Sequence, residues 1–187
     1  DSDLPAETPV VTILGELADQ PTFAAALTGL RVASDRFPGL LAAVEFPRSS
    51  DAAGWRLARE LGLLPRLTAL AGASLASRAM VASDLLVVAE SRGGPRCEVL
   101  EALGRGVPAI AVSDPLADVL LDAETAVLLG PAEHRAAAWG EAILRSLEHP
   151  RQARSLAQRG RSLVWARHRS SVAAAACLGA AQDLLHG

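Results

Sequence analysis

Short apolar runs recur along the chain, and the stretches between them carry apolar residues at a helical spacing. Val10–Leu14 is rich in β-branched residues and ends at Gly15, and Asp84–Ala89 contains the uninterrupted run LLVV. Uninterrupted apolar runs of this length are typical of parallel strands buried on both faces. Four more strands are predicted at Leu40–Phe46, Arg66–Leu70, Pro108–Val112 and Thr125–Leu129.

Helical patterns fill the intervals. Pro21 suits the first position of a helix, and Phe23, Ala26, Leu27 and Leu30 follow it at helical spacing. Further helices are predicted from Asp51 to Gly62, at Ser74–Ala82, Pro95–Gly104, Glu133–Glu148, Arg151–Trp165 and Ser171–Leu185, with a helical turn at Asp114–Leu121. Strands that alternate with helices predict an α/β domain built on a doubly wound, Rossmann-like parallel sheet, followed by C-terminal helices.

The composition narrows the possible functions. Of the 187 residues 50% are hydrophobic and 21% charged, which excludes a disordered chain, and the 3% of aromatic residues are expected to pack in the core. The chain contains no lysine. A Walker phosphate loop, a Schiff-base enzyme, a kinase-type ATP site and a phospho-receiver domain all rely on lysine, so none is present in standard form.

Charge and cysteine content indicate the setting. The net charge of −3 gives no general attraction to nucleic acid, but residues 151–187 carry six arginines and one acid while residues 1–150 carry 12 arginines and 20 acids. These basic C-terminal helices are most simply a solvated face; a docking surface for an acidic partner or a membrane is the alternative. Cys97 and Cys177 match no metal or redox spacing. We therefore expect a reduced, cytoplasmic protein, with the inner face of the membrane as the alternative location.

Two loops are the expected ligand-binding regions, because open parallel sheets bind ligands beyond the carboxyl ends of their strands. The first loop follows Val10–Leu14 and begins with Gly15 and Glu16. The second follows the LLVV run and offers glycines for close backbone approach and arginines for bidentate phosphate contacts. Its candidate residues are Ser91, Arg92, Gly93, Gly94 and Arg96.

The helix after the second loop adds two carboxylates. Glu98 and Glu101 are three residues apart and therefore share a helix face, where a carboxylate can accept hydrogen bonds from the vicinal hydroxyls of a ribose. A tight Gly-Gly-Pro turn with glutamates that favour the helix N-terminus is the equally simple structural alternative. No carboxylate cluster has metal-ligand spacing, and we expect His134, His149, His168 and His186 to lie on the surface of the C-terminal helical part. We therefore expect no metal and no cofactor.

The segment ASDLLVVAESRGGPRCEVLEALGRGVPAIAVSD resembles the signature of the group-one family of retaining glycosyltransferases with the GT-B architecture. In that family a strand leads to Pro-Ser, a glycine-bearing loop and a helix with a Glu-Ala-x-x-x-Gly-x-Pro-Val core. The counterparts here are Ser91, Gly93, Gly94, Glu101, Ala102, Gly106, Pro108 and Ala109. Four further segments of the chain are similar to segments of the family and follow in the same order, namely Val11–Leu27, Leu57–Gly72, Thr125–Pro131 and Arg154–Arg169.

The resemblance implies roles for some residues and departures at others. Glu101 corresponds to the family's second motif glutamate, which binds the ribose hydroxyls of the donor. Gly93 stands where the first motif glutamate is expected, and Glu16 stands where the first loop usually carries an arginine. The family's donor-binding lysine has no counterpart, which leaves Arg92 and Arg96 as the candidate substitutes.

The resemblance implies that residues 9–187 are the C-terminal, donor-binding half of a glycosyltransferase that moves a sugar from a nucleotide-diphosphate donor to an unknown acceptor with retention. Residues 1–8 would be the remnant of a linker to an absent N-terminal acceptor domain, and the isolated domain would be inactive. Two alternatives stay open: a degenerate GT-B-like domain that serves interaction or regulation, and a nucleotide-sugar epimerase.

Overall fold

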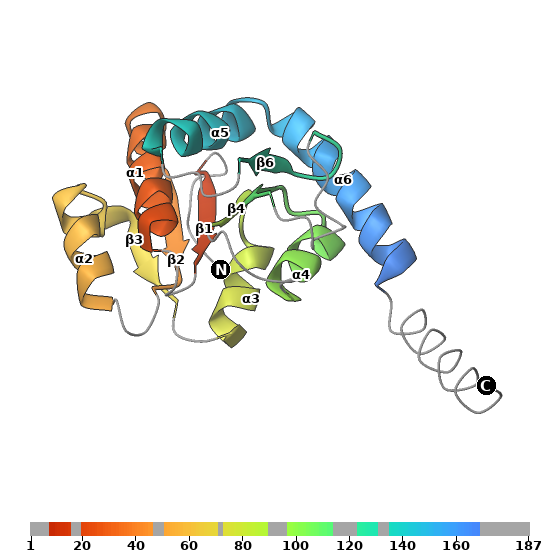
Figure 1. The fold of residues 1–187 in the computed structure, drawn as a ribbon, viewed down its shortest axis with the longest axis horizontal. Helices are drawn as coiled ribbons and strands as arrows, with labels where there is room; N and C mark the ends of the chain where they lie inside the picture. Colours follow the sequence, from red (N-terminus) through yellow and green to blue (C-terminus); the bar gives the residue numbers. More distant parts are fainter. Residues whose placement is uncertain are drawn as a thin grey trace.

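Six parallel strands form the central sheet of the structure, a computed structural model that describes residues 8–15, 20–46, 51–70, 73–89, 97–113, 123–130 and 135–168. The strands are β1 (Val10–Leu14), β2 (Leu41–Val44), β3 (Leu67–Ala69), β4 (Leu85–Val88), β5 (Ala109–Val112) and β6 (Val127–Leu129). Their order is β3-β2-β1-β4-β5-β6, with every neighbouring pair parallel. The predicted doubly wound α/β architecture is confirmed (Figure 1).

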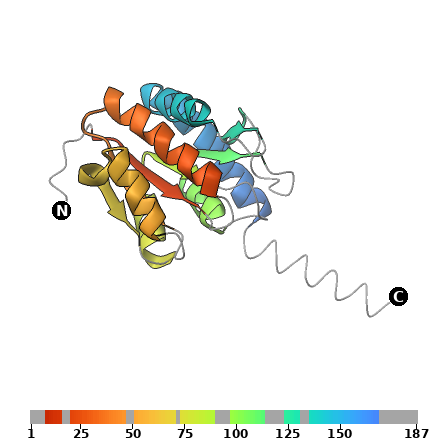
Figure 2. The same cartoon turned by 60° about the vertical axis from the view of Figure 1, so that its left-hand side comes forward.

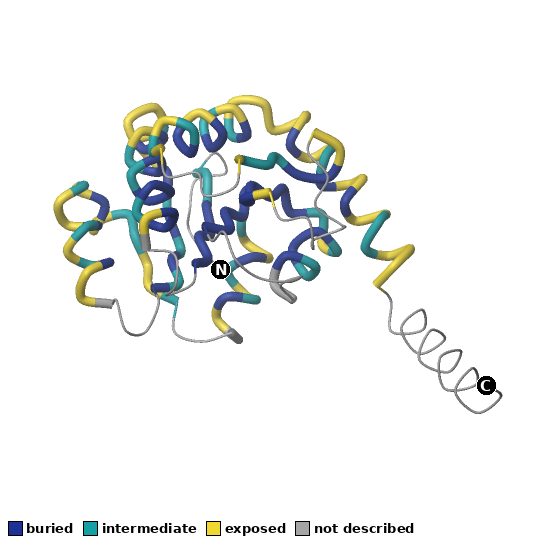
Figure 3. The backbone as a smooth tube through the Cα atoms, in the orientation of Figure 1, coloured by how far each residue is buried: buried dark blue, intermediate teal, exposed yellow. Residues whose placement is uncertain are grey.

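Helices cover both faces of this sheet. One face packs against α1 (Gln20–Arg36), α2 (Asp51–Glu60) and α5 (Ala136–Glu148), and the other against α3 (Ala73–Val81), α4 (Cys97–Arg105) and α6 (Pro150–Arg167). In β4, Leu85 and Val87 join the first core while Leu86 and Val88 join the second, because successive strand side chains point to opposite faces. The continuously apolar LLVV run is therefore buried throughout (Figure 3).

Small residues let α1 and α5 approach each other closely over the first face (Figure 2). A Cβ atom built on Gly29 would lie 2.6 Å from the backbone nitrogen of Gly140, closer than real side chains come. Trp139, fully buried beside this contact, is the largest side chain of the core. Glycine is thus required where the two helices cross.

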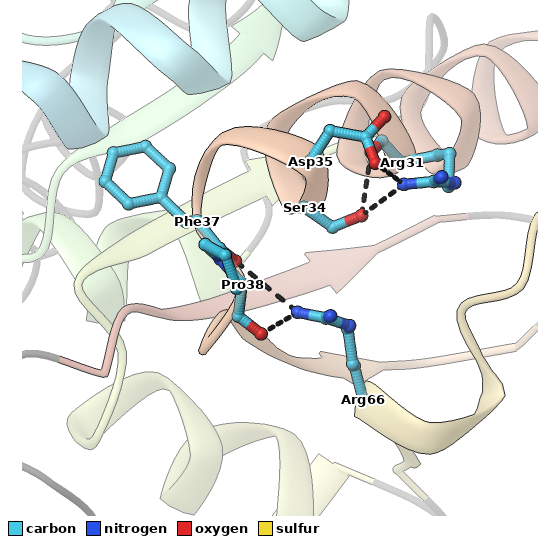
Figure 4. Close-up of polar contacts among 6 residues, drawn as sticks. All are labelled: Arg31, Ser34, Asp35, Phe37, Pro38 and Arg66. Carbon is cyan, nitrogen blue, oxygen red and sulfur yellow. Dashed lines mark hydrogen bonds and ion pairs between the residues drawn. The ribbon is translucent and has the colours of Figure 1, made fainter.

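Arginines fix two turns through backbone carbonyl groups. Arg66, which ends a 3-10 turn at Leu64–Arg66, donates to the carbonyl oxygens of Phe37 and Pro38 in the turn that leads from α1 to β2 (Figure 4). From α6, Arg159 donates to the carbonyl oxygens of Glu124 (2.7 Å) and Ala123 (3.2 Å) in the turn before β6. Ala123 has a φ of 55°, so this turn holds a non-glycine residue in the left-handed region.

The observed elements match the predicted ones with small changes at their ends. Every predicted strand is present, and most are shorter than predicted. α2 ends near Gly62 as predicted, because that glycine takes a φ of 69°. The predicted helical turn at Asp114–Leu121 and the helix at Ser171–Leu185 lie outside the described residues, as do residues 1–7 of the predicted linker.

One core prediction is wrong. Trp165 does not pack in the core but is 48% exposed on α6. Its indole N–H donates to the carbonyl oxygen of Gly104 at the end of α4 (3.2 Å), and the guanidinium of Arg161 lies 5.8 Å from the ring centroid. Tryptophan combines an apolar ring with a polar N–H, so it can join two helix ends at the surface.

No helix within the described ranges is both long and apolar enough to cross a bilayer.

Candidate functional site

The strand order places the candidate site between β1 and β4. From β1 the chain winds outward to β2 and β3, then returns so that β4 pairs with the other side of β1. Ligands of open α/β sheets bind at such a reversal, beyond the carboxyl ends of the strands. The carboxyl ends of β1 and β4 are joined by a hydrogen bond, because the backbone N–H of Ala89 donates to the carbonyl oxygen of Leu14 (2.8 Å). The two predicted ligand loops therefore start side by side.

Gly15 lies at this junction and is buried. A Cβ atom at this position would lie 2.4 Å from Cδ2 of Phe23 and 3.3 Å from the carbonyl oxygen of Ala89. The first loop thus leaves β1 through a gap that admits no side chain. The predicted role of Gly15 in donor binding stays a prediction.

An aromatic cluster lies next to Gly15 at the same edge of the sheet. Phe23, in the first turn of α1, meets Phe46 edge-to-face with ring centroids 6.0 Å apart, and Phe46 lies 4.8 Å from Trp55 of α2. Phe23 and Phe46 are buried. Packed rings of this kind give this edge of the sheet an apolar base.

Glu101 is the candidate ligand-binding carboxylate that the structure describes most fully. It lies in α4, the helix that follows β4, and its side chain is 31% exposed. Its Oε1 atom accepts a hydrogen bond from the hydroxyl of Ser77 in α3 (2.5 Å) and forms an ion pair with Nη2 of Arg105 (2.6 Å), one helical turn later. Nη1 of Arg105 also donates to the carbonyl oxygen of Ser77 (3.1 Å). A partly exposed carboxylate held in this way can accept hydrogen bonds from a sugar diol.

The structure describes only part of the predicted site. Gly15 and Glu101 fall within the described residues. The remaining predicted donor-binding residues lie outside them, namely Glu16, Ser91, Arg92, Gly93, Gly94 and Arg96. The side chain of Glu98 also lies outside the described set, so the predicted pairing of Glu98 with Glu101 stays a prediction.

Sequence reasoning missed Ser77 and Arg105. Arg105 could have been found if the predicted helix Pro95–Gly104 had been extended by one residue, because it stands four residues after Glu101 in the orientation that favours an ion pair. Ser77 could not, because only the packing of α3 against α4 brings it to Glu101.

Metal-ligating side chains do not gather in the described ranges, where no group of three or more His, Cys, Asp or Glu residues could hold a metal ion. His149 and His168 are exposed, at the two ends of α6. The predicted surface position is thereby confirmed for these two histidines.

Comparison with known families gives the affiliation. A model of glycosyl transferase-like proteins matches residues 18–179, a range that includes β4 and Glu101 and begins just after Gly15 and Glu16. The chain belongs to the glycosyl transferase-like family. No curated protein matches the chain significantly.

Solved structures of glycosyltransferases share the fold. The C-terminal domain of a group 1 glycosyl transferase (LpcC) from Francisella tularensis has a TM-score of 0.71 and 18% identity, covering 88% of this chain and 89% of that one. Sucrose-phosphate synthase from Thermosynechococcus elongatus has a TM-score of 0.75 and 25% identity, covering 98% and 47%. HepE from Anabaena, solved with UDP-glucose, has a TM-score of 0.72 and 16% identity, covering 87% and 45%. The predicted fold of a GT-B C-terminal domain is confirmed.

The lengths of these proteins differ from that of the present chain. The chain spans less than half of the synthase and of HepE, whereas it spans most of the separately solved Francisella domain. It thus aligns with only part of the synthase and of HepE.

Proposed function

We propose that this glycosyl transferase-like domain binds the nucleoside-diphosphate sugar donor of a retaining glycosyltransferase at the carboxyl edge of β1 and β4. The observation that carries the proposal is the carboxylate of Glu101, which is partly exposed on the helix after β4 and held by Ser77 and Arg105. In this proposal it accepts hydrogen bonds from the ribose hydroxyls of the donor.

The two loops would supply the rest of the donor site. Gly93 and Gly94 would let backbone N–H groups approach the diphosphate, and Arg92 and Arg96 would offer it bidentate contacts. The structure of Anabaena HepE with UDP-glucose supports a nucleotide sugar as the ligand class, because that protein shares the fold.

The acceptor would be bound elsewhere. Since the chain corresponds to less than half of the synthase and of HepE, we propose that a second, N-terminal half binds the acceptor and closes the site. On this proposal the 187-residue chain binds donor but does not transfer sugar.

A second candidate function has a specific observation in its favour. Glu16 stands where the resembled family carries an arginine, Gly93 replaces the first motif glutamate, and lysine is absent from the chain. Each lost charge-assisted contact costs binding about 1.5–3 kcal/mol. A degenerate domain that serves interaction or regulation would keep the fold without binding donor.

The basic C-terminal region bears on the partners of either candidate. Of the arginines on α6, Arg159 is bonded to a turn and Arg161 lies over Trp165, so part of this charge has a structural use. That observation favours the solvated-face interpretation; a docking surface for an acidic partner or a membrane stays a prediction.

Calorimetric titration of the chain with UDP, GDP and their sugars separates the two functions. We expect binding at millimolar affinity or tighter, because the ribose and diphosphate contacts are both offered by one edge of the sheet. Replacement Glu101→Ala should abolish it, since an uncharged methyl group cannot accept from the diol. Glu141→Ala, an exposed glutamate on α5, is the matched control and should bind as the wild type does. A folded chain that binds no nucleotide would refute the donor site.

A further inference from the structure

The group around Glu101 contains two residues for which the proposed function has no role beyond support. The hydroxyl of Ser77 donates to Oε1 of Glu101 (2.5 Å), and Nη2 of Arg105 forms an ion pair with the same oxygen (2.6 Å). Arg105 also reaches back to Ser77, through the carbonyl oxygen at 3.1 Å and the hydroxyl at 3.5 Å. Three side chains from two helices thus form a closed set of contacts.

Both donors converge on the same oxygen of the carboxylate. Within the described part of the chain, the other oxygen, Oε2, accepts no hydrogen bond. A carboxylate anchored through one oxygen loses its rotational freedom while the other oxygen keeps its acceptor capacity. Fixing an acceptor before the ligand arrives lowers the ordering cost of binding.

We propose that Arg105 and Ser77 are positioning residues that aim Glu101 at the ribose, and that they set the preference of the site for ribonucleoside over 2′-deoxyribonucleoside diphosphates. The inference rests on the proposed function, because it assigns Glu101 to the ribose. It adds that hydroxyl recognition depends on the orientation of Glu101 as well as on its presence.

A purely structural role is the competing explanation, and a similar group elsewhere in the chain provides a test of it. Arg31 forms an ion pair with Asp35, four residues later, and donates to the hydroxyl of Ser34 (3.1 Å). This group therefore also consists of an arginine, a carboxylate and a serine (Figure 4). That group lies within α1, whereas the group of Arg105, Ser77 and Glu101 joins α3 to α4 and contains the candidate ligand-binding carboxylate. Exposed pairs of this spacing contribute little to stability.

The experiment measures the ratio of affinities for each ribonucleotide and its 2′-deoxy counterpart, with UDP against dUDP and GDP against dGDP. Calorimetry is performed on the wild-type chain and on Arg105→Met, Ser77→Ala, Arg105→Lys, Glu101→Gln and the control Arg31→Met. Circular dichroism and thermal unfolding verify that each variant is folded.

We expect the wild type to prefer the ribonucleotide. Arg105→Met and Ser77→Ala should each lower the ratio by roughly 2- to 10-fold, the cost of ordering one mobile side chain, while affinity for the deoxy nucleotide, which keeps its 3′-hydroxyl, falls by a smaller factor. Arg105→Lys should retain part of the preference, because an ammonium group keeps the charge but loses the guanidinium fork. Arg31→Met should leave the ratio unchanged.

Three outcomes would overturn the inference. If Glu101→Gln lowers the ratio but Arg105→Met and Ser77→Ala do not, Glu101 contacts the ribose without needing these two residues, and the proposed function stands alone. If both variants weaken ribo and deoxy nucleotides equally, their role is structural. If the wild type binds both nucleotides equally well, the ribose contact itself is refuted, and the inference with it.

Discussion

At the scale of single residues, Gly15 makes the sharpest prediction about stability. Gly15→Ala should destabilise the chain by about 1–3 kcal/mol, because its methyl group would enter the space of the Phe23 ring and force the aromatic cluster to move. Gly130→Ala is the matched control, since a Cβ atom there meets nothing within 4 Å, and it should change stability by less than about 0.5 kcal/mol. Urea unfolding of the two variants measures the difference. Equal stabilities would show that the gap at Gly15 is not tight.

Residues also mark how far the candidate site could be predicted from the sequence. The sequence predicts Glu101 as a ligand-binding candidate, because a glutamate on the helix that follows a buried strand can be recognised from neighbouring residues alone. Ser77 and the aromatic contacts of Phe46 were not, because they depend on how separate helices settle on the sheet. The position of Trp165 was misjudged for the same reason: helical spacing does not reveal that the surface end of α4 offers a carbonyl oxygen.

At the scale of elements, the crossing of α1 and α5 should be intolerant of any side chain. Gly29→Ala would place a methyl group 2.6 Å from the backbone nitrogen of Gly140, which cannot move without its helix, so a loss of at least about 1–3 kcal/mol is expected. Gly104→Ala in α4 offers the contrast. Its added Cβ atom would meet Val164 at an ordinary 3.6 Å, and the helix should gain about 0.5–1 kcal/mol. Thermal unfolding should therefore move in opposite directions for the two variants, and a shared direction would contradict this account.

Elements were the most predictable level of the structure. Strands buried on both faces of a parallel sheet need unbroken apolar runs, so β1, β4 and β5 can be recognised in the sequence. Their ends were less predictable, since the last ladder bond depends on the neighbouring strand rather than on composition. The strand predicted at Leu40–Phe46, for example, is longer at both ends than β2, which covers only Leu41–Val44.

At the scale of the whole molecule, donor binding should raise the stability of the chain. A ligand that binds only the folded state stabilises it by about 2.7 kcal/mol at 100 times its dissociation constant. For a chain of this size that corresponds to a rise in Tm of roughly 5–10 °C. Scanning calorimetry with increasing UDP tests the expectation. Glu101→Ala should unfold at a temperature that does not depend on UDP, and a rise equal to that of the wild type would place the nucleotide elsewhere.

The contact of Arg159 with the turn before β6 has a consequence for the order in which the chain can be completed. β6 is a three-residue edge strand, and the turn that leads into it is fixed by Arg159 of α6, which lies 35 residues after Glu124 of that turn. While a ribosome is still synthesising α6, the turn lacks the two hydrogen bonds from Arg159. The edge strand β6, which pairs with the fully buried strand β5, is then held by fewer contacts. An open strand edge is a template for pairing with other chains. We therefore expect the last described helix, once folded, to protect this sheet edge from pairing with other chains.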